Sequence, residues 1–329
     1  MQTSYKPPSY LTEDEYRLCI RVARLYYENE LTQDKIGELL GLSRVKINRV
    51  LQQARASGIV EIRINEPPNA FSEIENSLIT KYSLRDATVV MEEEPGQGLY
   101  LSLARGASSW LKLHIESGMR IGLGLGRTIS HLPKVFQVDH RVECTFTEVV
   151  GAASDHSGGL AASYNITSKM AELAGGTAEF FYAPTFVSDP ELRKKLLEEP
   201  SVILSMERAR QCTIILQSIG PVDNSALLYL HGYLTGKDLE ELRKQGAVGD
   251  ALGHYFRADG SPLRSLSDER VIGLDLEDIG RVPWSVAIAG GQEKVIPIDA
   301  ALRGKYFNVL ITDRQTASAL LALEDDHAE

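Results

Sequence analysis

Residues 31–64 constrain the fold more than any other stretch, because they have the pattern of two short amphipathic helices joined by a tight turn. Thr32 is a favoured N-cap residue for the first helix. The apolar residues that follow at i, i+3 and i+4 form one stripe, expected to be buried: Ile36, Leu39 and Leu40. Gly41 predicts the end of this helix, since glycine readily adopts the left-handed conformation found after helix C-termini.

The second helix of this segment is predicted to start after Ser43, a good N-cap, and to end at Gly58. Its apolar stripe keeps the spacing of one helix face and consists of Ile47, Val50, Leu51 and Ala54. With that stripe turned inward, the outward-facing residues are Arg44, Val45, Asn48 and Arg49. A recognition helix carries such groups to base edges and phosphates in the major groove of DNA.

The same pattern also fits a plain αα-hairpin with a solvated basic face, and the helix spacing alone leaves the two interpretations even. The charge distribution favours DNA binding. Residues 31–64 contain six basic and three acidic side chains, whereas the whole chain has a net charge of −10. A positive region on an acidic protein needs an anionic partner, and DNA is the simplest one.

Position along the second helix suggests a role for each polar side chain. Arg44 and Asn48 lie four residues apart on the exposed face near the helix start, so we expect them to contact base edges. Gln33 and Arg49 are expected to hold phosphates. The predicted DNA-binding residues are Gln33, Ser43, Arg44, Val45, Lys46, Asn48 and Arg49.

Three further elements complete a predicted N-terminal helix-turn-helix domain of residues 1–64. Thr12 and Glu15 form a capping box for a helix whose apolar face would cover the other two helices: Leu18, Val22, Leu25 and Tyr26. Residues 59–64 alternate apolar and polar side chains with the period of a half-buried strand, which predicts a small wing. Residues 1–10 are expected to form a mobile arm.

The clearest linker in the chain is residues 65–69, with the sequence NEPPN. Two adjacent prolines forbid helix continuation and supply no amide donors, so we place a domain boundary here. Residues 1–64 carry a net charge of +2 and the remainder −12. We therefore expect the second domain, residues 65–329, to make little contact with DNA.

Beyond the linker, strand and helix patterns alternate. Strands are predicted at residues 87–91, 119–123, 145–150, 178–182, 213–217, 285–289 and 308–312. Helices are predicted at residues 71–82, 98–117, 128–136, 163–174, 189–198, 201–210 and 295–303. This alternation predicts an α/β domain with a doubly wound, mostly parallel sheet covered by helices on both faces. Such sheets bind ligands at the carboxyl ends of their strands.

Composition argues against several other classes of protein. The chain has 329 residues, of which 43% are hydrophobic and 24% charged, as in ordinary globular proteins. No apolar run approaches the roughly 20 residues of a membrane helix, and the N-terminus lacks the apolar core of a signal peptide, so a cytoplasmic location is expected. Cys19, Cys144 and Cys212 have no paired spacing, so neither a metal site nor a disulfide framework is indicated, and no cofactor is expected.

A glycine-rich loop, GLGLGRT at residues 122–128, follows a predicted strand and opens a helix. Gly124 and Gly126 let the backbone approach an anion, the helix N-terminus offers free N–H groups, and Arg127 with the Thr128 hydroxyl completes a phosphate site. The loop is not a dinucleotide fingerprint, because GxGxxG would require glycine at position 127 or 129. The alternative is a glycine turn required only for close packing of helix and sheet.

Two other loops carry candidate polar groups. Asp250 lies among small residues in the segment GAVGDALG, where a carboxylate can accept hydrogen bonds from two hydroxyls of a polyol. Lys294 follows the pair Gly290-Gly291 after a predicted strand, within reach of either a phosphate or the Asp250 carboxylate. Taken singly, Asp250 fits an N-cap better, and Lys294 fits a solvated side chain.

The run YYENELTQDKIGELLGLSRVKINRVLQQARASGIVEI resembles the DNA-binding segment of the SorC family of bacterial sugar-responsive transcription regulators. The blocks GAVGDALGHYFRADG, DERVIGLDL and AIAGGQEKVIPIDAALRG resemble the effector domain of that family, so the likeness covers nearly the whole chain. The resemblance implies an effector domain similar to ribose-5-phosphate isomerase and glucosamine-6-phosphate deaminase. It also implies a tetramer, which agrees with the need for symmetric copies of a recognition helix on DNA half-sites.

The resemblance further implies a sugar-phosphate pocket. In the family, a segment similar to residues 122–128 binds the phosphate of the effector, and the aspartate and lysine matching Asp250 and Lys294 line the pocket. The implied effector-binding residues are Gly124, Gly126, Arg127, Thr128, Asp250, Arg270, Gln292 and Lys294. This chain has Gly151-Ala152-Ala153 where the family often shows a Gly-Gly pair, so the role of the following Asp155-His156-Ser157 loop is left open.

The main hypothesis is a homo-oligomeric transcription regulator of a carbohydrate or polyol operon, whose partners are operator double-stranded DNA and a phosphorylated sugar or polyol. The alternative is a sugar-phosphate isomerase or deaminase with an appended DNA-binding domain. We expect Asp250, beside a lysine and an arginine, to be strongly ionised and therefore a weak general base, which disfavours the enzyme. A large domain that serves only for assembly is disfavoured by the glycine-rich loop and by Asp250 and Lys294.

Overall fold

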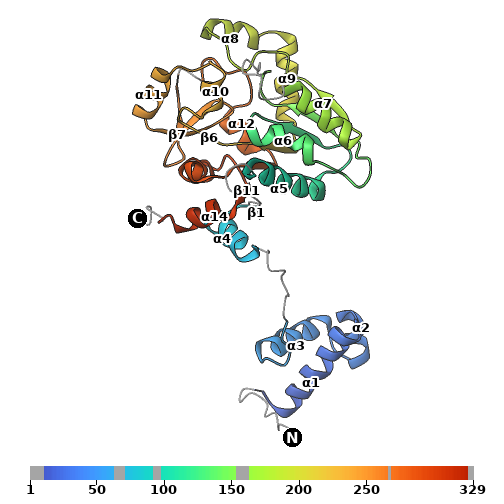
Figure 1. Cartoon of the computed structure of the whole chain (residues 1–329). Coiled ribbons are helices and arrows are strands. Elements are labelled where there is room, and N and C mark those ends of the chain that lie inside the picture. The colour runs from blue at the N-terminus through green and yellow to red at the C-terminus, as the bar shows by residue number, and fades with distance from the viewer. Residues whose placement is uncertain (1–10, 63–70, 92–97, 153–162, 266–267, 325–329) are drawn as a thin grey trace. The chain divides into compact units, whose positions relative to one another are not determined.

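The computed structural model describes residues 11–62, 71–91, 98–152, 163–265 and 268–324. The chain divides into two compact units, Met1–Pro68 and Asn69–Glu329 (Figure 1). The predicted linker at residues 65–69, and with it the boundary after residue 64, falls outside the described residues and stays a prediction. The N-terminal arm and the Asp155-His156-Ser157 loop also fall outside them.

Local capping signals set the helix boundaries of the first unit. It consists of α1 (Glu13–Ala23), the π-helix η1 (Arg24–Glu28), α2 (Gln33–Leu40) and α3 (Arg44–Ala56). Thr12 and Glu15 form the predicted capping box, and the hydroxyls of Thr32 and Ser43 each accept a hydrogen bond from an amide three residues later. Gly41 ends α2 in the left-handed conformation, with φ 64°.

The interior of this unit is an apolar cluster to which all three α-helices contribute: Cys19, Val22, Ala23, Ile36, Ile47, Val50, Leu51 and Ala54. The stripe predicted for α3 is therefore confirmed. In α2, the predicted burial of Leu39 is wrong, because its side chain is 65% exposed. Gly37 is buried in its place, since the turn after α2 closes over it; a Cβ at Gly37 would lie 2.6 Å from the carbonyl oxygen of Leu42.

The wing strand predicted for residues 59–64 is wrong for residues 59–62, which form a bend followed by irregular chain. The amide of Val60 donates to the carbonyl of Ala54 at 3.1 Å, and Gly58 has a φ of 71°. Ile59 and Val60 both pack against the core of the unit. Their apolar side chains therefore belong to the turn that ends α3 and do not form one face of a strand. A strand also needs a partner, and the described residues of this unit include no other strand.

The second unit is built on a seven-stranded sheet in which every neighbouring pair is parallel, in the order β1-β11-β10-β5-β2-β3-β4. Its strands are β1 (Asp86–Val90), β2 (Arg120–Leu123), β3 (Thr145–Glu148), β4 (Thr177–Glu179), β5 (Ile214–Gln217), β10 (Trp284–Ile288) and β11 (Val309–Asp313). The predicted parallel sheet is confirmed, with each strand within a few residues of its expected position.

Helices cover both faces of this sheet. One face packs against α5 (Leu99–His114), α6 (Arg127–Val135) and α7 (Ser163–Ala174). The other packs against α4 (Ser72–Tyr82), α9 (Pro200–Arg210), α12 (Leu276–Arg281), α13 (Val295–Arg303) and α14 (Arg314–Ala322), with α8 (Pro190–Leu197) beside α9. Successive side chains of a strand point to opposite faces, so Ile214 and Leu216 join the first layer and Ile215 joins the second.

A smaller antiparallel sheet, which the sequence pattern did not reveal, follows β5. Its strands are β6 (Gly220–Pro221), β7 (Ala247–Ala251), β8 (His254–Arg257) and β9 (Pro262–Leu263), with α10 (Leu227–Leu230) and α11 (Gly236–Lys244) inserted between β6 and β7. The segment around Asp250 was expected to be a loop, but it forms β7. Its small residues allow close packing, since a Cβ at Gly249 would lie 2.8 Å from Pro297 of α13.

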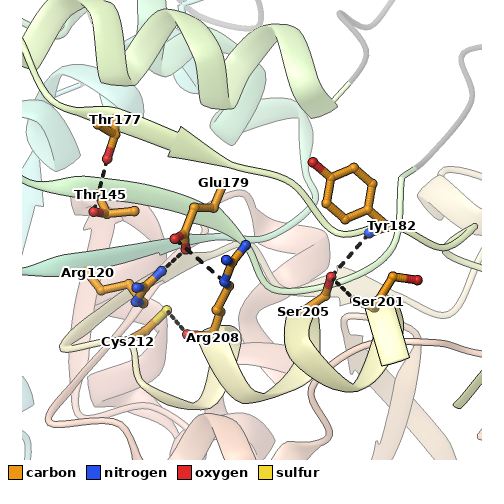
Figure 2. Close-up of polar contacts among 9 residues, drawn as sticks. All are labelled: Arg120, Thr145, Thr177, Glu179, Tyr182, Ser201, Ser205, Arg208 and Cys212. Carbon is orange, nitrogen blue, oxygen red and sulfur yellow. Dashed lines mark hydrogen bonds and ion pairs between the residues drawn. The ribbon is translucent and has the colours of Figure 1, made fainter. Parts of the chain in front are cut away.

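Polar contacts hold the edge strand β4 and helix α9 to the rest of the sheet (Figure 2). Glu179, the last residue of β4, accepts a hydrogen bond from Arg120 of β2 and lies 3.7 Å from the guanidinium of Arg208 in α9. The hydroxyls of Thr145 and Thr177 are 3.1 Å apart across β3 and β4. These contacts compensate for the single-sided backbone pairing of an edge strand.

Among the residues that the structure describes, no helix is both long and apolar enough to cross a membrane.

The two-layer packing predicts very different costs for the same substitution at two sites in α5. Leu103 is fully buried and Leu113 is 82% exposed. Leu103→Ala leaves a cavity between α5 and the sheet, so we expect the free energy of unfolding to fall by about 2–5 kcal/mol. Leu113→Ala should change it by less than about 0.5 kcal/mol. Urea unfolding followed by circular dichroism measures both, and equal losses would contradict this packing.

Candidate functional site

The candidate site lies at the point of the large sheet where the order in which the chain adds strands reverses. The chain runs from β2 through β3 to β4 toward one edge, and from β5 through β10 to β11 toward the other, while β2 and β5 are neighbours. The loops that leave two such strands diverge and open a crevice beyond their carboxyl ends. Here the loop after β2 leads into α6, and the loop after β5 leads into the small sheet.

A small pocket occupies this crevice, with a cavity volume of about 50 Å³. Four of the predicted effector-binding residues line it: Gly126, Arg127, Asp250 and Lys294. The other lining residues are Leu125, Gln217, Ser218, Ile219, Gly220, Pro221, Ser225, Leu227, Leu228, Leu252 and Gly253. Segments far apart in the sequence therefore converge on one concave site, as expected for a ligand pocket.

The glycines of the loop after β2 are required by packing against the end of β5. A Cβ at Gly124 would lie 1.7 Å from the side-chain oxygen of Gln217, and a Cβ at Gly126 would lie 2.5 Å from the Cβ of Ser218. At either position a larger residue would require the neighbouring side chain or the loop to move. Close packing thus explains why glycine occupies both positions, so the glycines by themselves do not indicate an anion site. That interpretation depends on the charged groups and free amides around them.

Arg127 is the first residue of α6 and projects toward the segment after β5. Its guanidinium donates a hydrogen bond to the carbonyl of Ser225 at 3.0 Å and lies 5.1 Å from the centre of the Tyr100 ring. The N-cap residue of α6 is Gly126, which has no side chain to bond the amides of the first turn. The helix N-terminus therefore presents unsatisfied N–H groups and a partial positive charge beside Arg127.

Lys294 ends the 3₁₀ turn η2 (Gln292–Lys294) and is only 6% exposed. Its ammonium makes no hydrogen bond and no ion pair with any of the described residues. Burial and the nearby charge of Arg127 lower the pKa of Lys294 to about 8, against the opposing influence of Glu293, Asp250 and Asp223. A buried ammonium without a direct partner is costly unless an anion or another strong acceptor completes its surroundings.

Asp250 lies on β7, and its carboxylate accepts a hydrogen bond from the amide of Gly253 at 3.0 Å. Burial raises the pKa of Asp250 to about 6, although the Gly253 amide, Lys294 and His254 all act to lower it. Desolvation outweighs the attraction of the neighbouring cations, so the pKa is raised where we expected these cations to favour the charged form, although the carboxyl is still mostly ionised at pH 7. The raised pKa makes this carboxylate a stronger base than expected.

The remaining predicted effector-binding residues do not line the pocket. Gly124 faces Gln217, and Thr128 is fully buried, with no hydrogen-bond partner for its hydroxyl among the described residues. Arg270 donates to the carbonyl of Val187 at 2.8 Å and stacks on Phe186. Gln292 is exposed on η2. A role in ligand binding for these four residues stays a prediction.

The pocket joins two kinds of chemistry. Arg127, Lys294 and the N-terminus of α6 supply positive charge and N–H donors, which suit a phosphate or carboxylate. Asp250 supplies acceptors for hydroxyl groups. Within the described part of the chain, no group of three or more histidine, cysteine, aspartate or glutamate residues is placed to hold a metal ion.

The predicted DNA-binding side chains share a surface on the first unit. Gln33, Arg44, Val45 and Asn48 line one shallow concavity at the start of α3. Val45 is 74% exposed, although it is apolar. The guanidinium of Arg44 lies 3.9 Å from the carboxylate of Asp34 in a highly exposed pair, which contributes little to stability. The remaining members of the set, Ser43, Lys46 and Arg49, are also exposed.

Sequence reasoning missed the pocket residues at and after the end of β5, above all Gln217 and Ser218. Gln217 ends a strand whose other residues are apolar, Ser218 follows it, and nothing in their spacing marks them as functional. The signal lies in the glycines at positions 124 and 126, which indicate that some other segment packs against the loop. The sequence alone does not identify that segment, because β2 and β5 are separated by more than 90 residues.

Comparisons with known proteins agree with this architecture. A family model described as "Putative sugar-binding domain" matches residues 66–322. The chain is 30% identical over 312 residues to the deoxyribonucleoside regulator of Bacillus subtilis (strain 168), covering 94% of this chain and 99% of that protein. It is 31% identical to the erythritol catabolism regulatory protein EryD of Brucella abortus (strain 2308), covering 92% and 96%.

The fold is similar to that of the full-length sorbitol operon regulator SorC from Klebsiella pneumoniae. The two structures superpose with a TM-score of 0.71 at 24% sequence identity, and the match covers 94% of this chain and 100% of that chain. At this identity the likeness concerns the fold alone.

The raised pKa of Asp250 predicts a stability gain when the carboxyl group is removed. The folded pKa of about 6 lies above the ordinary value of 3.8, so the carboxyl contributes most stability below pH 4 and loses it as pH rises through 6. Asp250→Asn keeps an acceptor for the Gly253 amide. At pH 7 to 8 it should be more stable than the parent by about 1–3 kcal/mol, and the gain should vanish below pH 4.

Urea unfolding between pH 3.5 and 8 measures this difference. Asp259→Asn is the matched control, because Asp259 is exposed and its hydrogen bonds from Ser261 lower the pKa of the carboxyl. That variant should show no gain at neutral pH. A pH-independent difference for Asp250→Asn would contradict the assignment of a desolvated carboxyl group.

Proposed function

Because this chain belongs to the SorC-type family of sugar-binding transcriptional regulators, we propose that it regulates a carbohydrate or polyol catabolic operon and is controlled by a phosphorylated sugar or polyol. In this proposal the N-terminal domain predicted for residues 1–64 binds operator DNA through a helix-turn-helix. The domain predicted for residues 65–329 binds the effector and assembles the oligomer. The effector alters DNA binding through its different affinities for two states of the protein.

The observation that carries the effector proposal is the convergence of Lys294, Arg127 and a helix N-terminus on one pocket, where Lys294 is only 6% exposed and its ammonium bonds none of the described residues. The mutual repulsion of two cations and the loss of water both disfavour this arrangement in the free protein. A ligand that carries a dianionic phosphate offsets the repulsion between the two cations, which a neutral sugar cannot do, and the hydroxyls of the same ligand can accept from the ammonium.

We assign the two ends of the ligand to different sides of the pocket. Arg127, the backbone at Gly126 and the free amides of α6 hold the phosphate, and Thr128, which is buried behind the pocket lining, has only a supporting role at this end. Asp250 and Lys294 hold the sugar or polyol hydroxyls, since a carboxylate accepts from two hydroxyls and an ammonium donates to them. Gly124, Arg270 and Gln292 have only supporting roles in this proposal, because other contacts or exposure keep them from the pocket lining.

On the DNA side, we propose that Arg44 and Asn48 contact base edges and that Gln33 and Arg49 contact phosphates, with Ser43, Val45 and Lys46 beside them. Gln33, at the start of α2, is partly exposed and the other six residues are exposed around the start of α3, which supports this arrangement. One such helix reads few base pairs, so specific binding needs symmetric copies on half-sites. We therefore propose a homo-oligomer, and a tetramer on the strength of the family resemblance.

A sugar-phosphate isomerase or deaminase activity is the second candidate function. One observation favours it: the pocket holds a carboxyl group with a pKa near 6 and an ammonium with a pKa near 8, which suits acid–base chemistry at neutral pH. Desolvated binding groups shift in the same way without any catalytic role. The names of the relatives, all regulators, favour the first candidate.

The effector proposal is tested with Arg127→Ala and matched pairs of ligands: sorbitol 6-phosphate with sorbitol, and ribose 5-phosphate with ribose. The variant loses a charge-assisted contact worth on the order of 1.5–3 kcal/mol, so the phosphorylated ligand should bind at least about tenfold more weakly. The unphosphorylated ligand should be nearly unaffected. Calorimetric titration measures both affinities, and nuclear magnetic resonance of the same samples reveals any turnover.

The control for this experiment is Arg105→Ala, an exposed arginine of α5 that does not line the pocket. It should bind both ligands like the parent protein. If Arg127→Ala weakened both ligands equally, the loop would be structural and the phosphate would lie elsewhere. Conversion of the sugar phosphate by the parent protein would establish the second candidate function.

The DNA proposal is tested with Arg44→Ala and Arg55→Ala, which remove the same charge from the first and the last turn of α3. Arg44→Ala should lower the affinity for the operator by about 1–3 kcal/mol and relax the sequence preference. Arg55→Ala should weaken specific and non-specific DNA alike, by much less. Fluorescence anisotropy at several salt concentrations separates the two effects, and an unchanged specificity ratio for Arg44→Ala would exclude it from base contacts.

A further inference from the structure

Gln217 links the two loops that form the pocket. It is the last residue of β5 and is only 3% exposed. Its side-chain oxygen accepts a hydrogen bond from the amide of Leu125 at 3.0 Å, and its side-chain nitrogen donates to the carbonyl of Ser218 at 2.6 Å. One planar amide group thus ties the loop after β2 to the loop after β5.

The shape of the first loop depends on this side chain. The oxygen of Gln217 fills the space that a Cβ at Gly124 would occupy, with 1.7 Å between the two positions. Ser218 fills the corresponding space beside Gly126. The residues on both sides of Leu125 are therefore in contact with the end of β5, and the Leu125 amide itself is bonded there.

The position of Leu125 determines where the free amides of α6 point. Only Gly126 separates Leu125 from Arg127, the first residue of the helix. A phosphate accepts strong hydrogen bonds from a helix N-terminus only when the N–H groups are aimed at its oxygens, and these bonds weaken steeply as the angle departs from linearity. A small rotation at Leu125 would therefore reduce the affinity for a phosphate without closing the pocket.

We propose that Gln217 is the positioning residue of the anion site and that it sets the preference of the pocket for phosphorylated over unphosphorylated ligands. The inference rests on the proposed function, since it concerns the same pocket. Both ends of the Gln217 amide are engaged by the protein, so its effect on the ligand is exerted through the loop and the N-terminus of α6. It has little influence on the hydroxyl-binding side, where Asp250 lies.

Two variants of the full-length protein separate positioning from charge. Gln217→Met keeps the length of the side chain but removes both hydrogen bonds. Gln217→Glu keeps an acceptor for the Leu125 amide but removes the donor to Ser218 and places a carboxylate beside the anion site. The control is Gln211→Met at the exposed C-cap of α9, which makes the same chemical change away from the pocket.

The probes are inorganic phosphate, sorbitol 6-phosphate and sorbitol, titrated calorimetrically into each protein. Both Gln217 variants should bind the two phosphate-bearing probes at least tenfold more weakly and bind sorbitol within twofold of the parent. Amide hydrogen exchange should show faster exchange at Leu125 in Gln217→Met and unchanged exchange in Gln217→Glu. Gln211→Met should match the parent in every measurement.

The outcomes distinguish this inference from the proposed function. If the parent protein binds sorbitol 6-phosphate no better than sorbitol, the phosphate proposal fails, and the inference fails with it. If the parent prefers the phosphate and Gln217→Met keeps that preference, the proposed function stands and the positioning role of Gln217 is wrong. Equal losses for phosphorylated and unphosphorylated probes would show that Gln217 serves only the stability of the loop.

Discussion

The close contact between the loop after β2 and the end of β5 is the constraint on which the rest of the site depends. Gly124 and Gly126 have no side chains because Gln217 and Ser218 occupy that space. The contact fixes the start of α6, and with it the direction of Arg127 and of the free helix amides. In a doubly wound sheet, the loops after two neighbouring strands leave in opposite directions only where the strand order reverses, here between β2 and β5. The crevice opens there, which is why the pocket lies at this point.

The electrostatics of the pocket follow from that packing. Because the loops are closely packed, Lys294 and Asp250 lose much of their contact with water, and the pKa values move to about 8 and about 6. Both shifts oppose the charged forms, so the free protein holds two groups in an unfavourable state. Such a site is poised to gain free energy from a ligand that brings an anion and hydroxyl groups together.

The two units differ in size, in charge and in how their apolar cores are built. The first unit is small, and its capped helices share one apolar cluster, which leaves the start of α3 free to carry polar side chains. The second unit is large and acidic, with an apolar layer on each face of its sheet. In the proposed function this division keeps the positive surface for DNA separate from the ligand pocket, so that either can change without destabilising the other.

The sequence by itself determined the elements whose signals are local. The caps at Thr12, Thr32 and Ser43, the stop at Gly41 and the alternation of strands and helices were all predicted, because these depend on interactions within a few residues. The tertiary structure decided the rest. The exposure of Leu39, the lack of a wing strand at residues 59–62, the small antiparallel sheet, the raised pKa of Asp250 and the role assigned to Gln217 all depend on packing between distant segments. Burial and close contact are properties of the assembled chain, so no local pattern records them.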